Sequence, residues 1–404
     1  MDDSFNDFYR YNGFGKEIIP EGSFEIYWIS MINIEEKYNC CGCGACAQKC
    51  PKQCITLKQD SEGFLYPEID TEKCIDCGLC EKVCPVLNPY QARNPLQTFA
   101  AINKDEKIRL ESSSGGIFTL LAEFVISQGG VVFGARYDEE WQVTLDYTES
   151  VEGLAAFRGS KYVQARTGET YKQCEKILKD GRKVLFSGTP CQIAGLKHFL
   201  CEDYDNLLAV ECICHSAPSQ LVWRKYLEQH RKGRKIKCVN FRDKTTGWSK
   251  YKYSLVIEYE NGEKDVYPSG QPYMCALVSN LITRPSCSAC KAREGMSGAD
   301  ISLGDFWGIW DIYPEFDDNK GTTLIVVYSE KGIAFLKDKE IKVHKASIID
   351  ARKYNEGLSS SKSLHNKRDL FFSNLPSTMN VDALIENSLR ITLFDRVKRL
   401  LRIK

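Results

Sequence analysis

Eight cysteines between positions 40 and 84 have the clearest chemistry in this sequence. They repeat the spacing C-x2-C-x2-C-x3-C-P twice. A two-residue gap lets one tight loop turn three thiolates toward a single cubane, and in the bacterial ferredoxin pattern the fourth thiolate serves the other cluster. The spacing therefore predicts two [4Fe-4S] clusters. One would be held by Cys40, Cys43, Cys46 and Cys84, and the other by Cys74, Cys77, Cys80 and Cys50.

Tetrahedral zinc is the alternative for any CxxC spacing. Zinc sites use isolated pairs, whereas this chain places three cysteines in tandem before a Cys-Pro and then repeats the pattern. That arrangement favours iron–sulfur clusters. Cys41 and Cys54 lie outside the repeat, and we interpret them as small residues near the clusters. Residues 55–57 and 63–66 alternate around a polar turn, which predicts a short hairpin bracing the cysteine loops.

More cysteines follow in the middle of the chain. Cys191 comes at the expected start of a helix, where the helix dipole favours a thiolate that is either reactive or a metal ligand. Cys214 ends an expected strand, and Cys287 and Cys290 form another CxxC pair. These four thiols predict a third cluster, provided that the fold assembles them. Half of a zinc site or a redox pair is the alternative for Cys287 and Cys290.

Two side chains are candidates for proton transfer. His215 has the only side chain whose unperturbed pKa lies near neutrality, and Cys191 adds an acidic thiol. A structural, hydrogen-bonded histidine is the alternative for His215.

A flavin is the simplest cofactor to follow iron–sulfur clusters, because clusters carry single electrons and flavins pass both one and two. The loop at 112–116, Ser-Ser-Ser-Gly-Gly, precedes an expected helix and can wrap a flavin phosphate with backbone N–H groups, hydroxyls and the helix dipole. The loop at 158–162, Arg-Gly-Ser-Lys-Tyr, adds a basic pair and an aromatic ring. The alternatives are a Ser-rich helix cap and a charged surface turn.

The elements that must position these groups alternate between strands and helices. Periodicity predicts helices at 117–126, 190–199 and 220–230, strands at 131–135, 183–187, 207–213, 300–304 and 321–328, and a hairpin at 251–267. We therefore expect an α+β protein, in which a small two-cluster ferredoxin-like domain precedes a larger α/β domain with a mostly parallel or mixed sheet. Function should lie in loops at the strand ends.

Breaks in the pattern divide the chain into four parts. We expect an N-terminal extension at 1–36, with Met1 and Met31 both open as the start, a dicluster domain at 37–90, a large oxidoreductase domain at 98–358 and a helical tail at 359–404. A polar surface connection should lead from residue 359 to a final helix at 381–404. Its basic end is expected to pack or, alternatively, to touch a membrane surface.

The composition excludes several classes of protein. The 54 basic and 54 acidic residues balance, so no overall field favours nucleic acid or an acidic membrane. The 19 cysteines do not indicate a secreted scaffold, because such scaffolds are short and eight of these residues fit a metal pattern. The acidic start lacks a signal-peptide core, and no apolar run approaches the roughly 18 residues of a membrane span. We expect a cytoplasmic protein.

Several motifs, taken in order, resemble one family. After the dicluster run come Ser-Ser-Ser-Gly-Gly at 112, Arg-Gly-Ser-Lys-Tyr-Val at 158, Phe-Ser-Gly-Thr-Pro-Cys-Gln at 186, Ile-Cys-His at 213, Phe-Arg-Asp-Lys at 241 and Gly-Asp-Phe-Trp-Gly at 304. This series is similar to the family of coenzyme F420 hydrogenase/dehydrogenase beta subunits. The resemblance implies FAD in the large domain, held by residues in three loops: Ser112, Ser113, Ser114, Gly115, Gly116, Arg158, Gly159, Ser160, Lys161, Tyr162, Gly188 and Thr189.

We therefore expect an iron–sulfur flavoprotein oxidoreductase. Its expected partners are an external electron donor or acceptor protein, and an organic substrate or a deazaflavin- or nicotinamide-type carrier, with a homo-oligomer and a link to surface-polysaccharide assembly as further expectations. Two alternatives stay open: an electron-transfer subunit whose chemistry occurs on a partner, and a non-catalytic scaffold stabilised by its clusters.

Overall fold

The structure is a computed structural model that describes residues 31–337, 340–359, 361 and 363–390. The expectations for the N-terminal extension before residue 31 and for the basic end of the tail after residue 390 lie outside the described residues. Within the described residues, no helix is both long and apolar enough to cross a membrane.

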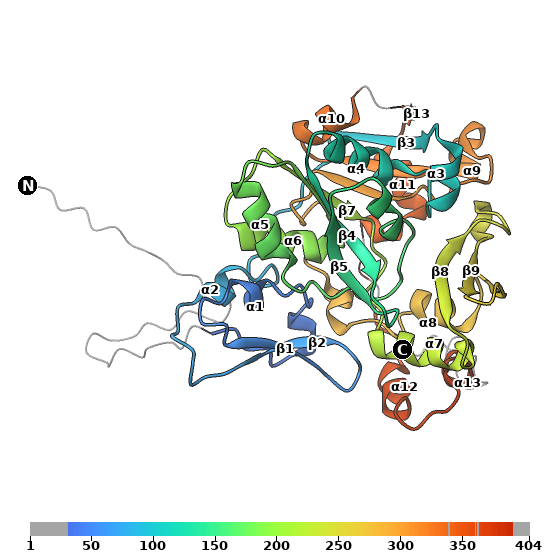
Figure 1. The fold of residues 1–404 in the computed structure, drawn as a ribbon. Coiled ribbons are helices and arrows are strands. Elements are labelled where there is room, and N and C mark those ends of the chain that lie inside the picture. The colour runs from blue at the N-terminus through green and yellow to red at the C-terminus, as the bar shows by residue number, and fades with distance from the viewer. Residues whose placement is uncertain (1–30, 338–339, 360, 362, 391–404) are drawn as a thin grey trace, which may run out of the picture.

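The N-terminal part is small and built around its cysteines. The expected hairpin is formed by β1 (Ile55–Gln59) and β2 (Leu65–Ile69), which pair antiparallel. Two short helices, α1 (Ala45–Lys49) and α2 (Leu79–Lys82), each begin after a glycine with positive φ, 75° at Gly44 and 66° at Gly78. Each helix carries the third cysteine of one repeat, so the two halves have the same local shape. In Figure 1 this part lies beside the helices α5 and α6 of the larger body.

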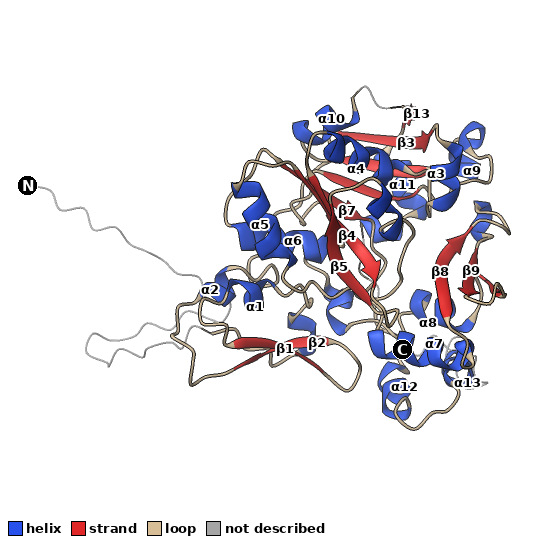
Figure 2. Ribbon diagram, viewed as in Figure 1, coloured by secondary structure: helices blue, strands red, loops and turns tan. Residues whose placement is uncertain are grey.

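An eight-stranded mixed sheet forms the centre of the large part (Figure 2). Its middle strands β11, β7, β6 and β4 pair in parallel, and its outer pairings are antiparallel. From edge to edge the strands are β13 (Ile341–Lys345), β3 (Gln97–Asn103), β12 (Thr323–Val327), β11 (Ile301–Asp305), β7 (Leu207–Cys212), β6 (Val184–Gly188), β4 (Val131–Tyr137) and β5 (Val143–Thr148).

Helices cover both faces of this sheet because successive strand residues point to opposite faces. Val131 and Phe133 belong to the core under α5 (Thr170–Lys179) and α6 (Pro190–Leu200). Val132 belongs to the core under α4 (Ile117–Ser127). Two-sided burial explains why the middle strands are continuously apolar in the sequence.

A smaller antiparallel sheet stands beside the large one. It consists of β8 (Ile236–Asp243), β9 (Ser254–Tyr259) and β10 (Lys264–Pro268), in the order β10-β9-β8. The expected hairpin is therefore confirmed and gains a third strand. Helices α7 (Gln220–Arg231), α8 (Pro272–Val278) and α13 (Val381–Leu389) lie near its lower end in Figure 1. Further α-helices are α3 (Glu106–Glu111), α9 (Ile309–Ile312), α10 (Glu330–Leu336) and α11 (Ile348–Tyr354).

The polar connection expected from residue 359 to 381 is wrong in one respect. The segment contains the helix α12 (Arg368–Asn374), in which Phe371 is fully buried. The polar composition concealed this helix because its buried cation, Arg368, is paired with a distant carboxylate, Glu62. The predicted α+β class, with a small iron–sulfur part and a larger part with a mixed sheet, is confirmed.

Candidate functional site

The predicted ligands of the first cluster lie together in the structure. We call Cys40, Cys43, Cys46 and Cys84 set I. Burial, together with the nearby Cys40 and Cys84 thiols, raises the pKa of Cys46 to about 12. The Cys46 and Cys84 thiols also lie close enough to Cys43 to act on its charge. Thiolates crowded in this way repel one another, and bound iron would remove that repulsion.

The predicted ligands of the second cluster surround a small cavity. We call Cys50, Cys74, Cys77 and Cys80 set II, and all four line a cavity of about 20 Å³. Cys54 lines it too, with its Sγ 3.3 Å from Cys50 Sγ. Cys50 thus lies with the second repeat and Cys84 with the first, which is the crosswise grouping that the ferredoxin spacing predicts. Ligation by these particular residues stays a prediction.

Zinc is the alternative metal for sets I and II. In the described residues, no three His, Cys, Asp or Glu side chains form a group that could hold a single metal ion. Zinc lies about 2.3 Å from each thiolate and would draw four of them into close contact. A cubane is larger and keeps its ligands further apart. The tandem spacing of the cysteines in the sequence is what favours iron–sulfur clusters over zinc.

A third group of cysteines assembles where the N-terminal part meets the large sheet. We call Cys191, Cys214, Cys287 and Cys290 set III. Cys191 lies at the start of α6, Cys214 follows β7, and the other two lie in or directly after the 3-10 helix η4 (Pro285–Ala289). Cys191 is close enough to the other three to influence the pKa of each thiol. The fold therefore brings together the four thiols predicted for a third cluster, although their role as ligands stays a prediction.

The expected thiolate character of Cys191 is wrong for the isolated side chain. Thr189 does cap α6, with Gln192 completing a capping box, and Thr189 Oγ1 lies 3.3 Å from Cys191 Sγ. However, the contact with the Cys41 thiol and burial raise the pKa of Cys191 well above its ordinary value. The Cys41 contact and desolvation together thus outweigh the helix dipole. The positive charge of iron in a bound cluster would favour the Cys191 thiolate.

The predicted FAD loops converge on one cavity of about 300 Å³. This volume is at the lower end of the range for small-molecule sites. The predicted residues that line the cavity are Ser112, Ser113, Ser114, Gly116, Arg158, Gly159, Ser160, Lys161, Tyr162, Gly188, Thr189, Cys214 and His215. Gly115 packs instead against β3, where a Cβ atom would lie 2.4 Å from the carbonyl oxygen of Ala101. Cys191 does not belong to this lining and lies in set III.

Hydrogen bonds hold the two loops in register. The backbone N–H of Ser160 donates to Ser113 Oγ at 2.5 Å. The Lys161 ammonium donates to the carbonyl oxygens of Arg158 and Gly159, both at 3.1 Å. Burial lowers the pKa of Lys161 to about 7. The loops thus present hydroxyls and N–H groups near the start of α4, a donor set that suits a phosphate-bearing cofactor, and Lys161 adds a titratable amine within its own loop.

One wall of the cavity carries a buried ion pair. Arg242 on β8 is fully buried, and its Nη1 donates to Asp305 Oδ2 at 2.5 Å and to the Tyr162 hydroxyl at 3.1 Å. The guanidinium packs over the rings of Tyr253 and Trp307, at 4.0 and 4.7 Å. The Phe-Arg-Asp-Lys motif therefore lies in the framework of the cavity rather than in a solvent-exposed turn.

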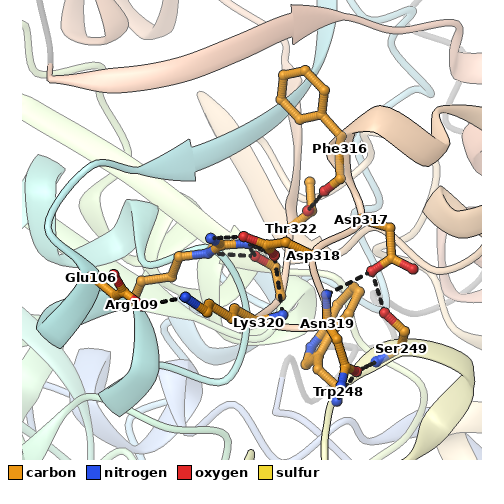
Figure 3. Close-up of polar contacts among 12 residues, drawn as sticks. Glu106, Arg109, Trp248, Ser249, Phe316, Asp317, Asp318, Asn319, Lys320 and Thr322 are labelled. Atoms are coloured by element: carbon orange, nitrogen blue, oxygen red, sulfur yellow. Dashed lines mark hydrogen bonds and ion pairs between the residues drawn. The ribbon is translucent and has the colours of Figure 1, made fainter.

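A polar loop outside the cavity supports this wall (Figure 3). Asn319 Oδ1 accepts from the backbone N–H groups of Trp248 and Ser249, both at 2.8 Å. Asp318 accepts two hydrogen bonds from Arg109 on α3, at 2.6 and 2.7 Å. Trp248 Nε1 in turn donates to the carbonyl oxygen of Ser113 at 3.0 Å. The loop at 317–320 thus joins the small sheet to the Ser-rich loop.

Sequence reasoning missed three features of the site. Cys41, interpreted as incidental, lies between set I and set III, beside both Cys43 and Cys191. Arg284 lies beside Cys40, and the 317–320 loop supports the cavity from outside. The adjacent cysteines at 40 and 41 and the polar run Asp-Asp-Asn-Lys were the available signals.

Comparison with known proteins adds two matches to families. Residues 181–351 match the family described as the C terminus of the beta subunit of coenzyme F420 hydrogenase/dehydrogenase. Residues 39–88 match the 4Fe-4S dicluster domain.

Two similar proteins come from Methanosarcina mazei and Methanocaldococcus jannaschii. One subunit of the F(420)H(2) dehydrogenase of Methanosarcina mazei is 26% identical over 169 residues, covering 38% of this chain and 46% of that protein. The coenzyme F420-dependent sulfite reductase of Methanocaldococcus jannaschii is 24% identical over 318 residues, covering 75% of this chain and 46% of that protein. This chain thus spans about half the length of these curated relatives. The F420-reducing [NiFe] hydrogenase complex from Methanosarcina barkeri aligns with a TM-score of 0.44 and 16% identity, over 74% of this chain and 92% of that chain.

Proposed function

We propose that this chain is an iron–sulfur flavoprotein oxidoreductase. Residues 39–88 match a 4Fe-4S dicluster domain. Residues 181–351 match the C terminus of the beta subunit in the coenzyme F420 hydrogenase/dehydrogenase family. Electrons pass between an external protein partner, the clusters, FAD and a two-electron carrier or organic substrate. The two relatives described above are an oxidoreductase and a subunit of one, which supports the redox class.

The observation that carries the proposal is the contact between set III and the cavity. Cys214 belongs to set III and also lines the cavity where both Ser112–Gly116 and Arg158–Tyr162 converge. Set III in turn adjoins Cys41, which adjoins Cys43 of set I. The thiols therefore form a continuous series from the dicluster domain to the cavity wall.

The residues around the cavity have different proposed roles. The Ser-rich loop and the start of α4 bind phosphate oxygens through N–H groups and hydroxyls. Lys161 gains a proton when an anion binds beside it, because a negative neighbour favours its charged form. His215 lines the cavity and holds or releases a proton there. FAD, when bound, supplies the conversion between one-electron and two-electron transfer.

The reaction partner is proposed from chemistry and from the relatives. Two similar proteins carry coenzyme F420 or its reduced form in their names, which supports a deazaflavin-type carrier over an organic substrate such as a component of surface-polysaccharide assembly. A second candidate function is an electron-transfer subunit with its chemistry on a partner. The name of the Methanosarcina mazei relative, which is one subunit of a dehydrogenase, favours this candidate.

Cofactor content tests the proposal directly. The full chain is purified without oxygen, and iron, sulfide, zinc and flavin are quantified on one sample. About twelve iron atoms and one FAD per chain are expected, because each of three cubanes carries four irons. A measured content of about eight irons per chain would contradict a cluster at set III. Iron without flavin would contradict the flavoprotein proposal and favour the second candidate function, an electron-transfer subunit.

A zinc site is the remaining alternative for set III. The variant C287S tests it, with C275S as its matched control, since Cys275 lies outside all three sets. C287S should lose iron, and C275S should not. A loss of zinc rather than iron in C287S would reassign set III to a structural zinc site.

A further inference from the structure

Arg284 is a fully buried cation between set I and set III. It precedes η4, the 3-10 helix that carries Cys287. The thiols near enough to interact with its charge include those of Cys40, Cys41, Cys191 and Cys287. The charge of one guanidinium thus acts on thiols of both set I and set III.

Hydrogen bonds from Arg284 fix the cysteine loop of set I in place. Its Nε donates to the carbonyl oxygen of Cys40 at 2.8 Å, and its Nη2 donates to that of Leu65 at 2.9 Å. Its Nη1 donates to Gln164 Oε1 at 3.2 Å, while Gln164 Nε2 donates to the carbonyl oxygen of Cys41 at 3.1 Å. Gly42 leaves the space for this arrangement, since a Cβ atom there would lie 2.8 Å from Arg284 Nη1.

The charge of Arg284 has no carboxylate among these partners. Within the described residues, its acceptors are two backbone carbonyls and one amide oxygen, and the ring of Tyr66 lies 4.2 Å from the guanidinium carbon. Arg368 provides a contrast, because it is equally buried but makes two hydrogen bonds to the Glu62 carboxylate, at 2.6 and 2.9 Å. A buried charge is strongly unfavourable without a counter-charge. The nearby thiolates, with an anionic cluster, would supply it.

We propose that Arg284 is a positioning residue for electron transfer between set I and set III. It holds the Cys40–Gly42 loop against the segment that carries Cys287. Its positive charge stabilises the reduced, more negative state of the cluster at set I and so raises the reduction potential there. The inference rests on the proposed function for the presence of clusters, and it assigns to Arg284 a role beyond packing.

The test measures the midpoint potentials of the dicluster domain in the full chain, by EPR-monitored redox titration under anaerobic conditions. R284Q removes the charge. Q164E keeps Arg284 but places a carboxylate beside its Nη1, so it neutralises the charge in place. In both variants the midpoint potential of one dicluster-domain cluster should fall by about 59 mV or more. This shift corresponds to a tenfold or greater loss of electron affinity for a one-electron couple. R284K retains the charge and should stay near the wild-type potential.

Two controls separate charge from packing. Q164L removes the same amide as Q164E without adding charge and should leave the potential unchanged. E62Q/R368Q removes a neighbouring ion pair of no net charge and should also leave it unchanged. Iron is quantified in every variant, and potentials are compared only for fully loaded protein.

The outcomes decide the inference separately from the proposed function. Unchanged potentials in loaded R284Q and Q164E would overturn it. If R284Q fails to load iron, the midpoint potential of Q164E alone tests the inference, and an unchanged potential would overturn it. If wild-type protein holds no cluster at set III, that part of the proposed function fails, and the shift at set I still tests whether Arg284 tunes the neighbouring cluster.

Discussion

Lys161 lies in a loop predicted to bind the cofactor and Cys191 lies at the start of α6, and their surroundings shift the pKa of both toward the neutral form. Burial lowers the pKa of Lys161 to about 7. The Cys41 thiol and burial raise the pKa of Cys191. A counter-charge beside either group therefore favours its charged form, and an anionic cofactor beside Lys161 or iron beside Cys191 would provide one.

Flavin binding should depend on pH through Lys161. In the free protein this amine loses its proton as pH rises through about 7, whereas beside a bound phosphate it keeps the proton to higher pH. Binding above pH 7 therefore requires proton uptake, and affinity should fall as pH rises from 7 to 9. Titration of apoprotein with FAD, followed by flavin fluorescence at several pH values, checks this.

The variant K161M should bind FAD more weakly at pH 6 and lose most of the pH dependence. K183M, at the exposed lysine directly before β6, is the control. Equal slopes of affinity against pH in K161M and wild type would contradict the role of Lys161.

The ion pair of Arg242 and Asp305 should be costly to break. D305N leaves a fully buried guanidinium without its carboxylate, and we expect a loss of about 3–5 kcal/mol in the free energy of unfolding. Denaturant unfolding of the apoprotein measures it. R242M/D305N removes both charges and should recover much of the loss, and a double variant no more stable than D305N would contradict the assignment.

At the scale of elements, the cavity depends on segments from distant parts of the chain. The Ser-rich loop precedes α4, the Arg158–Tyr162 loop follows β5, and Asp305 ends β11. The small sheet β8-β9-β10 contributes Arg242 and, through the loop after β8, Trp248. The 317–320 loop connects these elements (Figure 3).

N319A should loosen this connection. It removes the acceptor for two backbone N–H groups, of Trp248 and Ser249, at a cost of about 1–3 kcal/mol for buried donors left unpaired. Trp248 would then hold the Ser113 carbonyl less firmly, so flavin affinity should fall while iron content stays constant. N261A, in the exposed turn between β9 and β10, is the control. A loss of iron equal to the loss of flavin would indicate general unfolding instead.

At the scale of the whole molecule, the dicluster part is anchored to the large part at both ends. Tyr171 on α5 donates its backbone N–H to Gln48 Oε1 at 2.9 Å, and Gln48 lies on α1 close to Cys46. At the other end, Arg368 on α12 pairs with Glu62 in the hairpin turn. This second contact ties the late helical segment to the N-terminal part, so the dicluster part is held by residues from the middle and from the late part of the chain.

Crosswise ligation gives a prediction at this scale. C84S should remove the same EPR signal as C46S, and C50S should remove the same signal as C80S, because each pair shares one cysteine set. C201S, at an exposed cysteine outside the sets, should remove neither. If C84S instead matched C80S, the two clusters would be assembled from separate repeats.

Local features of the fold could be predicted from the sequence with good accuracy. The helix expected at 117–126 is α4, the strand at 183–187 is β6, and Thr189 caps α6 as its residue type suggests. The segment at 368–374 was missed, because a helix with a buried arginine looks polar until its partner Glu62 is known.

The sequence by itself determined the dicluster pattern, the local elements and the α+β class, because these depend on residues a few positions apart. Two-residue gaps orient three thiolates, and apolar runs specify strands buried on both sides. Only the tertiary structure decided which distant groups meet. It places Cys191 near Cys214 and Cys287, brings Cys41 between two cysteine sets, and puts Arg284 beside Cys40. These contacts depend on how the sheet, the hairpin and the late helices pack, and no local spacing specifies that packing.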